Sequence, residues 1–456
     1  MEKGQNSTPR ETAIAIVKRL QARGFPAFWV GGCVRDFLLG REPEDYDVVT
    51  AALPEQIEAA FERTIPVGRK FGVIVVLEGG RQFQVATFRA EADYRDGRRP
   101  EQVKFGDARA DAFRRDFTVN GLFFDPVQDK LLDWVQGEAD LRAKIIRTIG
   151  NPAERFAEDH LRMLRAIRLA AQLDFQIEPG TFAALRESAP KIREISAERI
   201  REELIKLFSP PHAARGLELL RESALLAQVL PELAATVDCE QSPDYHPEGS
   251  VFNHLVLMLK QMPANADPSL PWAVLLHDVA KPVTASTDQN TGSIHFYGHE
   301  RIGADMAQTI LERLKFPRKQ VEEIVQAVRC HMQFKDAPEM RKATLRRLLL
   351  RPTFPLELEL HRLDCLGSHR RLDVYDFLVD QAKELENQPE IRPPLLTGYD
   401  LLEMGMKPGP ELGALLEEIR EKQLSDELKT GAEARQWAAR RLREIVEIPR
   451  GKTGLD

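Results

Sequence analysis

Hydrophobic and polar positions follow two different patterns along this chain, and the change from one pattern to the other divides the chain into two parts. Residues 10–23 place apolar side chains on one helical face and end before Gly24, which predicts an amphipathic helix. A short apolar run at 28–30 predicts a buried strand, and a helix is expected at 34–39. Two further strands are predicted on either side of a Glu-Gly-Gly turn, at 71–77 and 82–88.

From Arg155 onward the apolar positions keep a helical period almost to the end of the chain. A long helix is expected from Arg155 into the 170s, and another after Ser196. Pro210 and Pro211 mark a break. The fold class predicted is therefore an α+β head, a mixed β-sheet with helices, followed by mostly α-helical domains. We expect four domains, comprising residues 1–150, 151–240, 241–385 and 386–456.

Composition restricts the classes of protein that fit this pattern. The chain has 456 residues, of which 43% are hydrophobic and 30% charged, as in ordinary globular proteins. No apolar run approaches the roughly 20 residues of a membrane helix, and residues 1–12 lack the apolar core of a signal peptide. We therefore expect a cytoplasmic protein without membrane contact.

Charge and cysteine content limit the partners and cofactors. The net charge of −7 argues against non-specific adhesion to nucleic acid over the whole surface, so any RNA contact requires a local basic face. The four cysteines are scattered, without a CxxC pair, and indicate neither a disulfide framework nor a zinc finger.

Two glycines and two aspartates supply the first candidate chemistry. Gly31 and Gly32 stand at the predicted strand-to-helix turn, where a backbone without Cβ atoms can approach a phosphate. Asp45 and Asp47 are two residues apart, which on a strand places both carboxylates on one face. Two adjacent carboxylates repel each other unless a cation lies between them. Mg²⁺ bound to substrate phosphates is the usual solution.

These residues resemble a family. The string GG-x-VRD-x-LLG followed by D-x-D is similar to the signature of class II tRNA nucleotidyltransferases and bacterial poly(A) polymerases. Four further blocks resemble the same family in the same order, RRDFTVNGL, DWVQGEADL, the EDxxRMLRAIRxAAQL element and SAERIREELIKLF. The resemblance covers about residues 25–210. One position departs from it, because Gln84 stands where the family often has an acid, so we expect two metal carboxylates rather than three.

The resemblance implies roles for individual residues. It implies that Asp45 and Asp47 bind the catalytic Mg²⁺ ions and that Asp116 contacts the ribose hydroxyls. Triphosphate or primer phosphates are assigned to Arg114 and Arg115, while the glycine turn and Arg35 cradle the triphosphate. The full set predicted to bind nucleotide is Gly31, Gly32, Arg35, Arg114, Arg115, Asp116, Asn120, Asp159, Arg162, Arg165 and Arg168.

Asp159 and Arg162 are three apart and are expected on one helical face. On a bare helix this spacing means a surface ion pair. In the family the two groups present a hydrogen-bonding edge to the incoming base, because a carboxylate accepts from an amino group and a guanidinium donates. Arg165 and Arg168 either continue toward phosphate or face solvent. The arginine-rich stretch 89–112 is either a solvated loop or a mobile loop near the active site.

Histidines crowd into the second half of the chain. Eight of the ten lie from His246 to His369, and the pattern with LLHDVAKP resembles the HD superfamily of metal-dependent phosphohydrolases. The resemblance implies a first metal held by His254, His277, Asp278 and Asp364, and a possible second one near His299 and His331. Imidazole with carboxylate suits Mn, Fe, Ni or Zn better than Mg²⁺ alone. A helical RNA-binding scaffold with residual ligands is the alternative.

The tail offers a basic helix with one aromatic residue, Trp437, among four arginines. It either grips tRNA or packs its tryptophan and solvates its charges. The resulting hypothesis is a nucleotidyltransferase head (1–150), a helical neck that binds base and RNA (151–240), an HD metal-binding domain (241–385) and a tRNA-binding tail (386–456).

The predicted function is template-independent addition of CCA to the 3′ end of tRNA from CTP and ATP. An A-adding enzyme and a poly(A) polymerase share the same blocks. A protein that is chiefly an HD phosphohydrolase with an RNA-binding head is the alternative from another class. The oligomeric state stays open.

Overall fold

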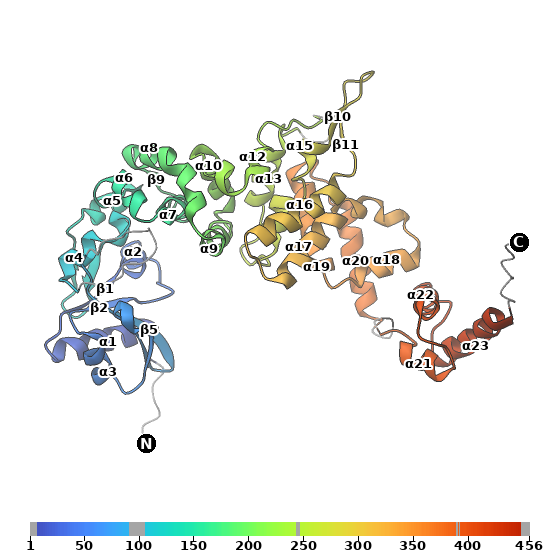
Figure 1. Cartoon of the computed structure of the whole chain (residues 1–456), viewed down its shortest axis with the longest axis horizontal. Helices are drawn as coiled ribbons and strands as arrows, with labels where there is room; N and C mark the ends of the chain where they lie inside the picture. Colours follow the sequence, from blue (N-terminus) through green and yellow to red (C-terminus); the bar gives the residue numbers. More distant parts are fainter. Residues whose placement is uncertain (1–6, 91–104, 243–246, 389–390, 392, 448–456) are drawn as a thin grey trace, which may run out of the picture. The chain divides into compact units, whose positions relative to one another are not determined.

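The computed structural model describes residues 7–90, 105–242, 247–388, 391 and 393–447 (Figure 1). Its contacts divide the chain into two compact units, Met1–Ala235 with Arg313–Lys315, and Thr236–Glu312 with Phe316–Asp456. The predicted division into a head, neck, HD domain and tail is finer than this and stays a prediction.

A seven-stranded mixed sheet forms the centre of the first unit, with strand order β3-β4-β5-β2-β1-β6-β7. The strands are β1 Ala27–Val30, β2 Val48–Thr50, β3 Thr64–Gly68, β4 Val73–Glu78, β5 Arg81–Thr87, β6 Phe123–Asp125 and β7 Lys130–Leu132. Only the β2–β5 pair is parallel among the pairs of this sheet, and the others are antiparallel. The predicted α+β head is confirmed.

Helices pack against this sheet and carry the strand connections. They are α1 Pro9–Ala22, α2 Gly32–Leu38, α3 Pro54–Ala60, α4 Ala108–Phe113 and α5 Gly137–Ala143. The helices α1 and α3 contact strands of the sheet. Ala112 of α4 packs with Val30, Val49 and Phe123 in one cluster. That cluster lies on the sheet face from which Asp47 also projects, because Val49 and Asp47 are two residues apart.

Two boundaries in the head differ from the prediction. The strand expected to carry Asp45 and Asp47 begins only at Val48, although the Asp47 carbonyl still accepts from the Val30 N–H of β1 at 3.1 Å. Part of the stretch predicted as a loop is the helix α4, which begins because the Asp107 carboxylate accepts from the Ala110 N–H at 2.8 Å. Residues 91–104 of that stretch lie outside the described residues.

The rest of the first unit is helical, apart from a short β8 Ile145–Ile146 and β9 Gln176–Ile177 pair. Its helices are α6 Pro152–Glu158, α7 Leu161–Leu173, α8 Pro179–Ser188, α9 Ala197–Leu207, α10 Ala213–Glu222, α11 Leu226–Val229 and α12 Pro231–Ala234. The single helix predicted after Arg155 is wrong, because Asp159 adopts an extended backbone between α6 and α7. Its carboxylate accepts from the Leu161 N–H at 3.1 Å, a local bond that competes with the helical ladder.

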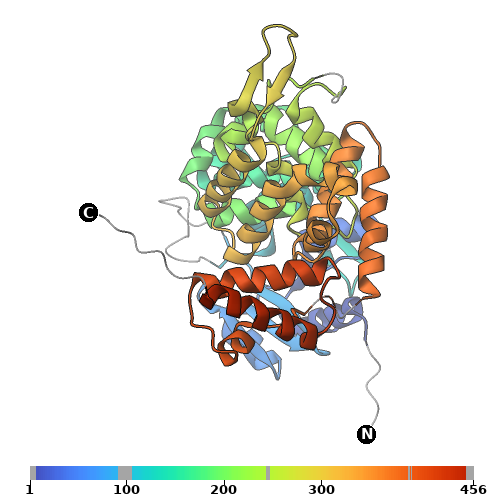
Figure 2. The same cartoon turned by 90° about the vertical axis from the view of Figure 1, so that its right-hand side faces the viewer.

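The second unit is a helical assembly with one hairpin, visible in yellow in Figure 2. Its helices are α13 Val251–Lys260, α14 Leu270–Leu276, α15 Lys281–Thr284, α16 His299–Arg313, α17 Arg318–Cys330, α18 Lys342–Leu349, α19 Phe354–Gly367 and α20 Asp373–Glu386. The hairpin strands are β10 Ala285–Thr287 and β11 Ile294–Phe296. Three tail helices follow, α21 Gly398–Glu403, α22 Pro410–Leu424 and α23 Gly431–Glu447, around a separate apolar cluster.

One buried ionic chain ties the RRD segment to the helices that follow it. The Asp116 carboxylate accepts from Arg165 of α7 at 2.8 Å from Nε and 2.7 Å from Nη2. Arg165 also lies 3.5 Å from Glu203 of α9, and Glu203 accepts from Arg168 at 2.7 Å. The side chains of Asp116 and Glu203 are 11% and 6% exposed, so solvent screens these pairs only weakly.

Replacing Asp116 with Asn should test this chain. Burial by itself raises the pKa of Asp116, but the charge of Arg165 and the hydrogen bonds from Arg165, Asn120 and the Phe117 N–H together lower it to about 2. A depressed pKa stabilises the fold above the ordinary Asp pKa near 4, and this contribution is lost as pH falls toward 2. We expect Asp116→Asn to lower the opening free energy of α7 and α9 at pH 7 by about 2 kcal/mol. Hydrogen exchange measures it, with the exposed Asp174→Asn as control. Equal protection in both variants would contradict the prediction.

Candidate active site and metal centre

The glycine turn lies beneath an arginine. Gly31 has φ +75°, which favours glycine, and a Cβ there would lie 3.1 Å from Nη1 of Arg115. Arg35, one turn into α2, donates to Asn120 Oδ1 at 2.8 Å and to both oxygens of Asp36 at 2.9 Å. Two guanidinium groups thus flank a backbone turn without side chains. This arrangement can hold an anion of phosphate type.

A buried acid that the sequence analysis missed orients the arginines. Asp111 of α4 is fully buried and pairs with Arg114 at 2.6 Å and with Arg115 at 3.0 Å. Burial raises the pKa of Asp111, but the charges of Arg115 and Arg114 outweigh it and lower the pKa below its usual range. The signal in the sequence was the spacing of three and four residues, which we overlooked because the stretch was predicted as a loop.

Asp45 and Asp47 are both exposed, whereas Tyr46 and Val48 between and after them are buried. The two carboxylates therefore project to the same side, as predicted, although they precede the strand. Although the Asp47 residue is exposed, neighbouring protein atoms partly desolvate its carboxylate and raise its pKa; Arg115 lowers the pKa and Asp45 raises it, with a net shift upward. A carboxyl pair with this mutual repulsion suits a divalent cation.

Gln84 lies beside this pair. Val48 pairs with Val85 in the parallel ladder, so Gln84 precedes Val85 as Asp47 precedes Val48, and both side chains are exposed. The position that could supply a third carboxylate therefore carries an amide. The described geometry is compatible with two acidic ligands in the head.

Five of the residues predicted to bind nucleotide form one hydrogen-bonded series. Arg35 donates to Asn120, which donates to Asp116 at 3.3 Å, and Asp116 continues to Arg165. Glu203 then joins Arg165 to Arg168. The sequence analysis left open whether Arg165 and Arg168 face phosphate or solvent. In this structure both bind acids of neighbouring segments.

Asp159 and Arg162 do not pair with each other's side chain in the described contacts. Arg199 of α9 donates to Asp159 at 2.8 Å, and Arg162 donates to Glu158 at 2.5 Å. Each group is thereby fixed in orientation by an opposite charge, and both stay partly exposed. Arg199 thus links α9 to the extended residue between α6 and α7.

The predicted histidines and aspartates of the second half do converge. The ligand atoms of His254, His277 and Asp278 lie within 4.8 Å of one another. The same holds for the ligand atoms of Asp278, His299 and His331. Asp278 belongs to both groups. Asp364 of α19 lies 3.0 Å from Nε2 of His254. The elements that supply these residues are α13, the end of α14, the start of α16, the end of α17 and α19.

Backbone carbonyls fix the orientation of three imidazoles. Nδ1 of His277 donates to the Val274 carbonyl at 2.9 Å, that of His299 to Phe296 at 2.7 Å, and that of His331 to Val328 at 2.6 Å. A carbonyl can only accept, so these rings carry a proton on Nδ1. Nε2 of each ring is left to face the cluster, the arrangement usual for metal-ligating histidines.

The electrostatics of this cluster fit a cation. Nε2 of His299 lies 3.1 Å from Nε2 of His331, so with Nδ1 protonated on both rings the two lone pairs face each other and can share a proton or a metal ion. Burial lowers the pKa of His331 to about 3, so the His331 ring is neutral at pH 7. Burial raises the pKa of Asp278, but the charges of His277 and Lys281 outweigh it and lower the pKa well below its usual range, which leaves an ionised ligand. The donors present fit one or two divalent ions.

Lys281 also belongs to this buried cluster, although the predicted set of metal ligands did not include it. It is 6% exposed, its Nζ lies 2.6 Å from Asp278, and it donates to Gln241 at 2.6 Å. Its signal was available in the string LLHDVAKP, three residues after Asp278. Gln241 has no such signal, because it lies far from the motif in sequence.

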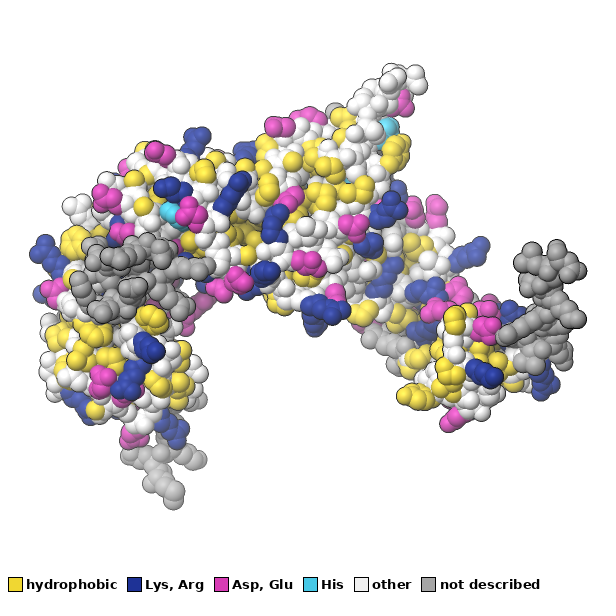
Figure 3. Space-filling model, viewed as in Figure 1, with side chains coloured by type: hydrophobic (Ala, Val, Ile, Leu, Met, Phe, Trp, Pro, Cys, Tyr) yellow, Lys and Arg dark blue, Asp and Glu magenta, His cyan; other side chains and the backbone are white. Residues whose placement is uncertain are grey.

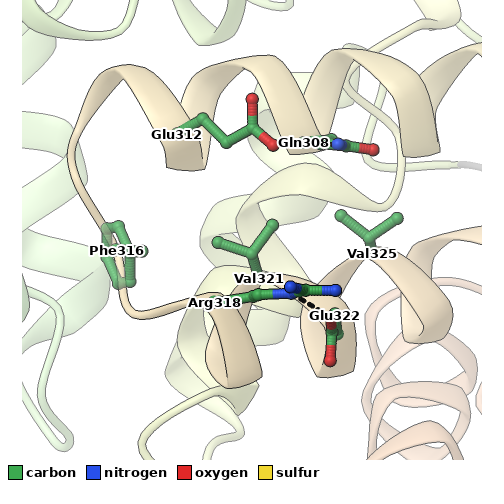
Figure 4. A pocket seen from close by; sticks show the side chains of 7 residues that line it. All are labelled: Gln308, Glu312, Phe316, Arg318, Val321, Glu322 and Val325. Atoms are coloured by element: carbon green, nitrogen blue, oxygen red, sulfur yellow. Dashed lines mark hydrogen bonds and ion pairs between the residues drawn. The ribbon is translucent and has the colours of Figure 1, made fainter.

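A groove of about 520 Å³ lies between α16 and α17 (Figure 4). Its lining comprises Gln308, Glu312, Phe316, Arg318, Val321, Glu322 and Val325. Arg318 and Glu322 form an ion pair at 2.8 Å across one turn of α17. None of the residues predicted for either centre lines it.

Two of the four arginines of the tail helix have acidic partners within the tail. Arg435 pairs with Asp400, and Arg441 lies 3.4 Å from Glu418. Trp437 packs against the tail cluster, with Lys422 5.5 Å from its ring centroid. Figure 3 shows basic side chains interspersed with acidic ones over the visible face. Within the described part of the chain, no helix has the length and apolar character needed to cross a membrane.

Three segments of the chain match known protein families. Residues 27–147 match the poly A polymerase head domain, residues 174–236 the probable RNA and SrmB-binding site of polymerase A, and residues 250–385 the HD domain. A CCA-adding enzyme of Streptococcus pyogenes serotype M3 is 32% identical over 415 residues, which cover 90% of this chain and 91% of that protein.

Solved structures agree. The Bacillus stearothermophilus CCA-adding enzyme in complex with CTP matches with a TM-score of 0.74 and 28% identity, over 96% of this chain and 99% of that one. The Thermotoga maritima CCA-adding enzyme with tRNA, at 19% identity and a TM-score of 0.57 over 96% and 97%, shares the fold. The nucleotidyltransferase head, the HD domain and the 32% identity together place this chain in the family of CCA-adding enzymes, which are nucleotidyltransferases.

Proposed function

We propose that this protein adds CMP, CMP and AMP to the 3′ end of tRNA without a template, using CTP and ATP. The observation that carries the proposal is the convergence of Asp47, Arg115 and Gly31 on one side of the head, within a chain that is 32% identical to a CCA-adding enzyme. The CTP present in the Bacillus stearothermophilus structure supports the choice of substrate.

In this mechanism Asp45 and Asp47 would hold two Mg²⁺ ions, which would supply stabilisation of the negative charge that develops during the reaction. The primer 3′-hydroxyl attacks the α-phosphate in line, a P–O bond forms, and the bond to pyrophosphate breaks. Arg115 and Arg35, held by Asp111 and by Asn120 with Asp36, neutralise the triphosphate. Because their partners fix these guanidinium groups before substrate arrives, little reorganisation is needed during the reaction.

In this proposal Asp159 and Arg162 recognise the incoming base. Arg199 holds one oxygen of Asp159 through Oδ2, and Glu158 holds one guanidinium nitrogen of Arg162. Each group retains hydrogen-bonding capacity for a base edge. A protein edge of this kind replaces a template strand, since it can prefer the amino groups of C and A.

The HD region is proposed to be a second centre, for hydrolysis of a phosphate ester. Mn, Fe, Ni or Zn suits its imidazole and carboxylate donors. The two groups that share Asp278 support one or two ions, with His254, His277 and Asp364 on one side and His299 with His331 on the other. A bound ion would supply an activated water as nucleophile.

One experiment separates CCA addition from its relatives. tRNA substrates ending at the discriminator base, at C and at CC are each incubated with one nucleoside triphosphate at a time. A CCA-adding enzyme extends all three in order, whereas an A-adding enzyme extends only the CC substrate. A poly(A) polymerase extends every end with ATP.

The first prediction concerns the head carboxylates. Asp45→Ala and Asp47→Ala should each lower nucleotide addition about 1,000-fold, since loss of a metal ligand removes several kcal/mol of charge stabilisation. Binding of tRNA should stay near wild type, and the exposed neighbour Glu44→Ala serves as control. Primer extension within tenfold of wild type for both variants would refute the role.

A second prediction concerns the base. Asp159→Ala combined with Arg162→Ala should reduce discrimination of CTP and ATP against UTP and GTP by about 10- to 100-fold, because a bidentate base contact is worth roughly 1–3 kcal/mol. Competition among the four nucleotides on one tRNA measures this. Unchanged selectivity in the double variant means that other residues read the base.

A third prediction separates the two centres. His277→Ala with Asp278→Ala should remove bound transition metal and any phosphatase or phosphodiesterase activity, while CMP and AMP incorporation stays largely unchanged. The reason is that metal ligands act locally. Metal analysis, both activity assays and circular dichroism decide it. Collapse of nucleotide addition in a folded variant would show that the HD region takes part in that reaction.

A further inference from the structure

The four buried histidines of the HD centre are held in two different ways. For His277, His299 and His331, Nδ1 donates to the carbonyl three residues earlier, as described above. His254 departs from this rule. Its Nδ1 lies 2.8 Å from Oε1 of Glu248, and its Nε2 lies 3.0 Å from Oδ1 of Asp364. The imidazole therefore stands between two carboxylates, one on each ring nitrogen.

Both groups of the Glu248–His254 contact are shielded from water. The side chain of His254 is fully buried, and that of Glu248 is 5% exposed. A Cβ on Gly367 of α19 would lie 3.2 Å from Cε1 and 3.3 Å from Nδ1 of His254, so α19 packs closely against the ring. Packing of this kind and the Glu248 carboxylate together leave the ring little freedom to rotate.

The geometry points to Glu248 as a positioning residue of the HD metal centre, one that holds His254 with Nε2 toward the metal. This inference rests on the proposed metal site. Glu248 lies two residues before the region that matches the HD domain, residues 250–385, and precedes α13, which carries His254. The contact thus comes from a segment that the domain pattern does not include.

Glu248 is assigned to the ring rather than to the metal for a geometric reason. The two nitrogens of an imidazole point in diverging directions, so a carboxylate on Nδ1 cannot share the ion that Nε2 binds. Nε2 faces Asp364, and His277 and Asp278 complete the group on that side. A carboxylate that accepts from the second ring nitrogen fixes the tautomer and makes the ring a stronger donor to the metal.

A carboxylate on the second ring nitrogen makes the imidazole a stronger metal donor than a carbonyl does, because the carboxylate carries a full charge. His254 is therefore the imidazole of this centre that has a carboxylate within hydrogen-bond distance of Nδ1, whereas Glu300 lies 3.8 Å from Nδ1 of His299. Loss of that carboxylate should weaken metal binding by about 10- to 100-fold, the range usual for partners of metal-bound histidines.

The test titrates the full-length metal-free protein with Co²⁺, whose visible absorption reports ligand type and geometry. Wild type, Glu248→Ala, Glu248→Gln and Glu240→Gln are compared. Glu240 is exposed and lies in the same segment, so Glu240→Gln matches the change of charge without touching the ring. We expect Co²⁺ affinity to fall about 10- to 100-fold in Glu248→Ala, and less in Glu248→Gln, whose amide oxygen still accepts. The control should bind as wild type, and the wavelengths of the Co²⁺ bands should stay in place.

Other outcomes would overturn the inference. Co²⁺ affinity within twofold of wild type in Glu248→Ala and Glu248→Gln, with lower thermal stability of the metal-free protein, would make Glu248 a purely structural residue. A shifted Co²⁺ spectrum in both variants would make Glu248 a metal ligand. If Glu248→Ala does not fold, the comparison of Glu248→Gln with Glu240→Gln decides. Wild type that binds no Co²⁺ would instead refute the metal centre itself.

Discussion

The first unit depends on the buried charge chain from Arg35 through Asn120, Asp116 and Arg165 to Glu203 and Arg168. It joins the helix after the glycine turn to α7 and α9, although these elements are distant in sequence. Charges this poorly hydrated stabilise a fold only when each is paired, so the chain defines one arrangement of its members. The groups that are to receive a nucleotide are therefore fixed by the same bonds that hold the helices.

Both centres use the same principle with different donors. In the head, Asp111 orients Arg114 and Arg115, which leaves fixed guanidinium groups above a bare backbone turn. In the HD centre, three backbone carbonyls and one carboxylate orient four imidazoles. Preorganised groups of this kind lower the cost of binding a charged ligand, because the reorganisation is complete before the ligand arrives. Oxygen donors suit Mg²⁺ in the head, and nitrogen donors suit a transition metal in the HD centre.

The places where sequence-based prediction failed have local causes. The helix expected to carry Asp159 and Arg162 is interrupted, because the Asp159 carboxylate bonds to the backbone two residues on and to Arg199. Helical periodicity does not register such a competing bond. The helix α4 forms in an arginine-rich stretch that was predicted as a loop. The Asp107 carboxylate caps the start of this helix, and Asp111 pairs with the positive charge of Arg114. In both cases an acidic side chain that bonds to nearby backbone N–H groups decided the local structure.

The sequence alone determined what depends on short spacing: the α+β head and helical remainder, the glycine turn, the shared side of Asp45 and Asp47, and which histidines and aspartates come together in the HD region. Period and motif act over a few residues, and these features are of that length. Only the tertiary structure decided which charges meet. Arg165 lies 49 residues from its partner Asp116, and Gln241 lies 40 residues from its partner Lys281, so no pattern within one segment encodes these two contacts. Glu248 is only six residues from His254, yet its carboxylate reaches the ring because the chain folds back ahead of α13, where the Glu240–Ser250 bridge closes the segment.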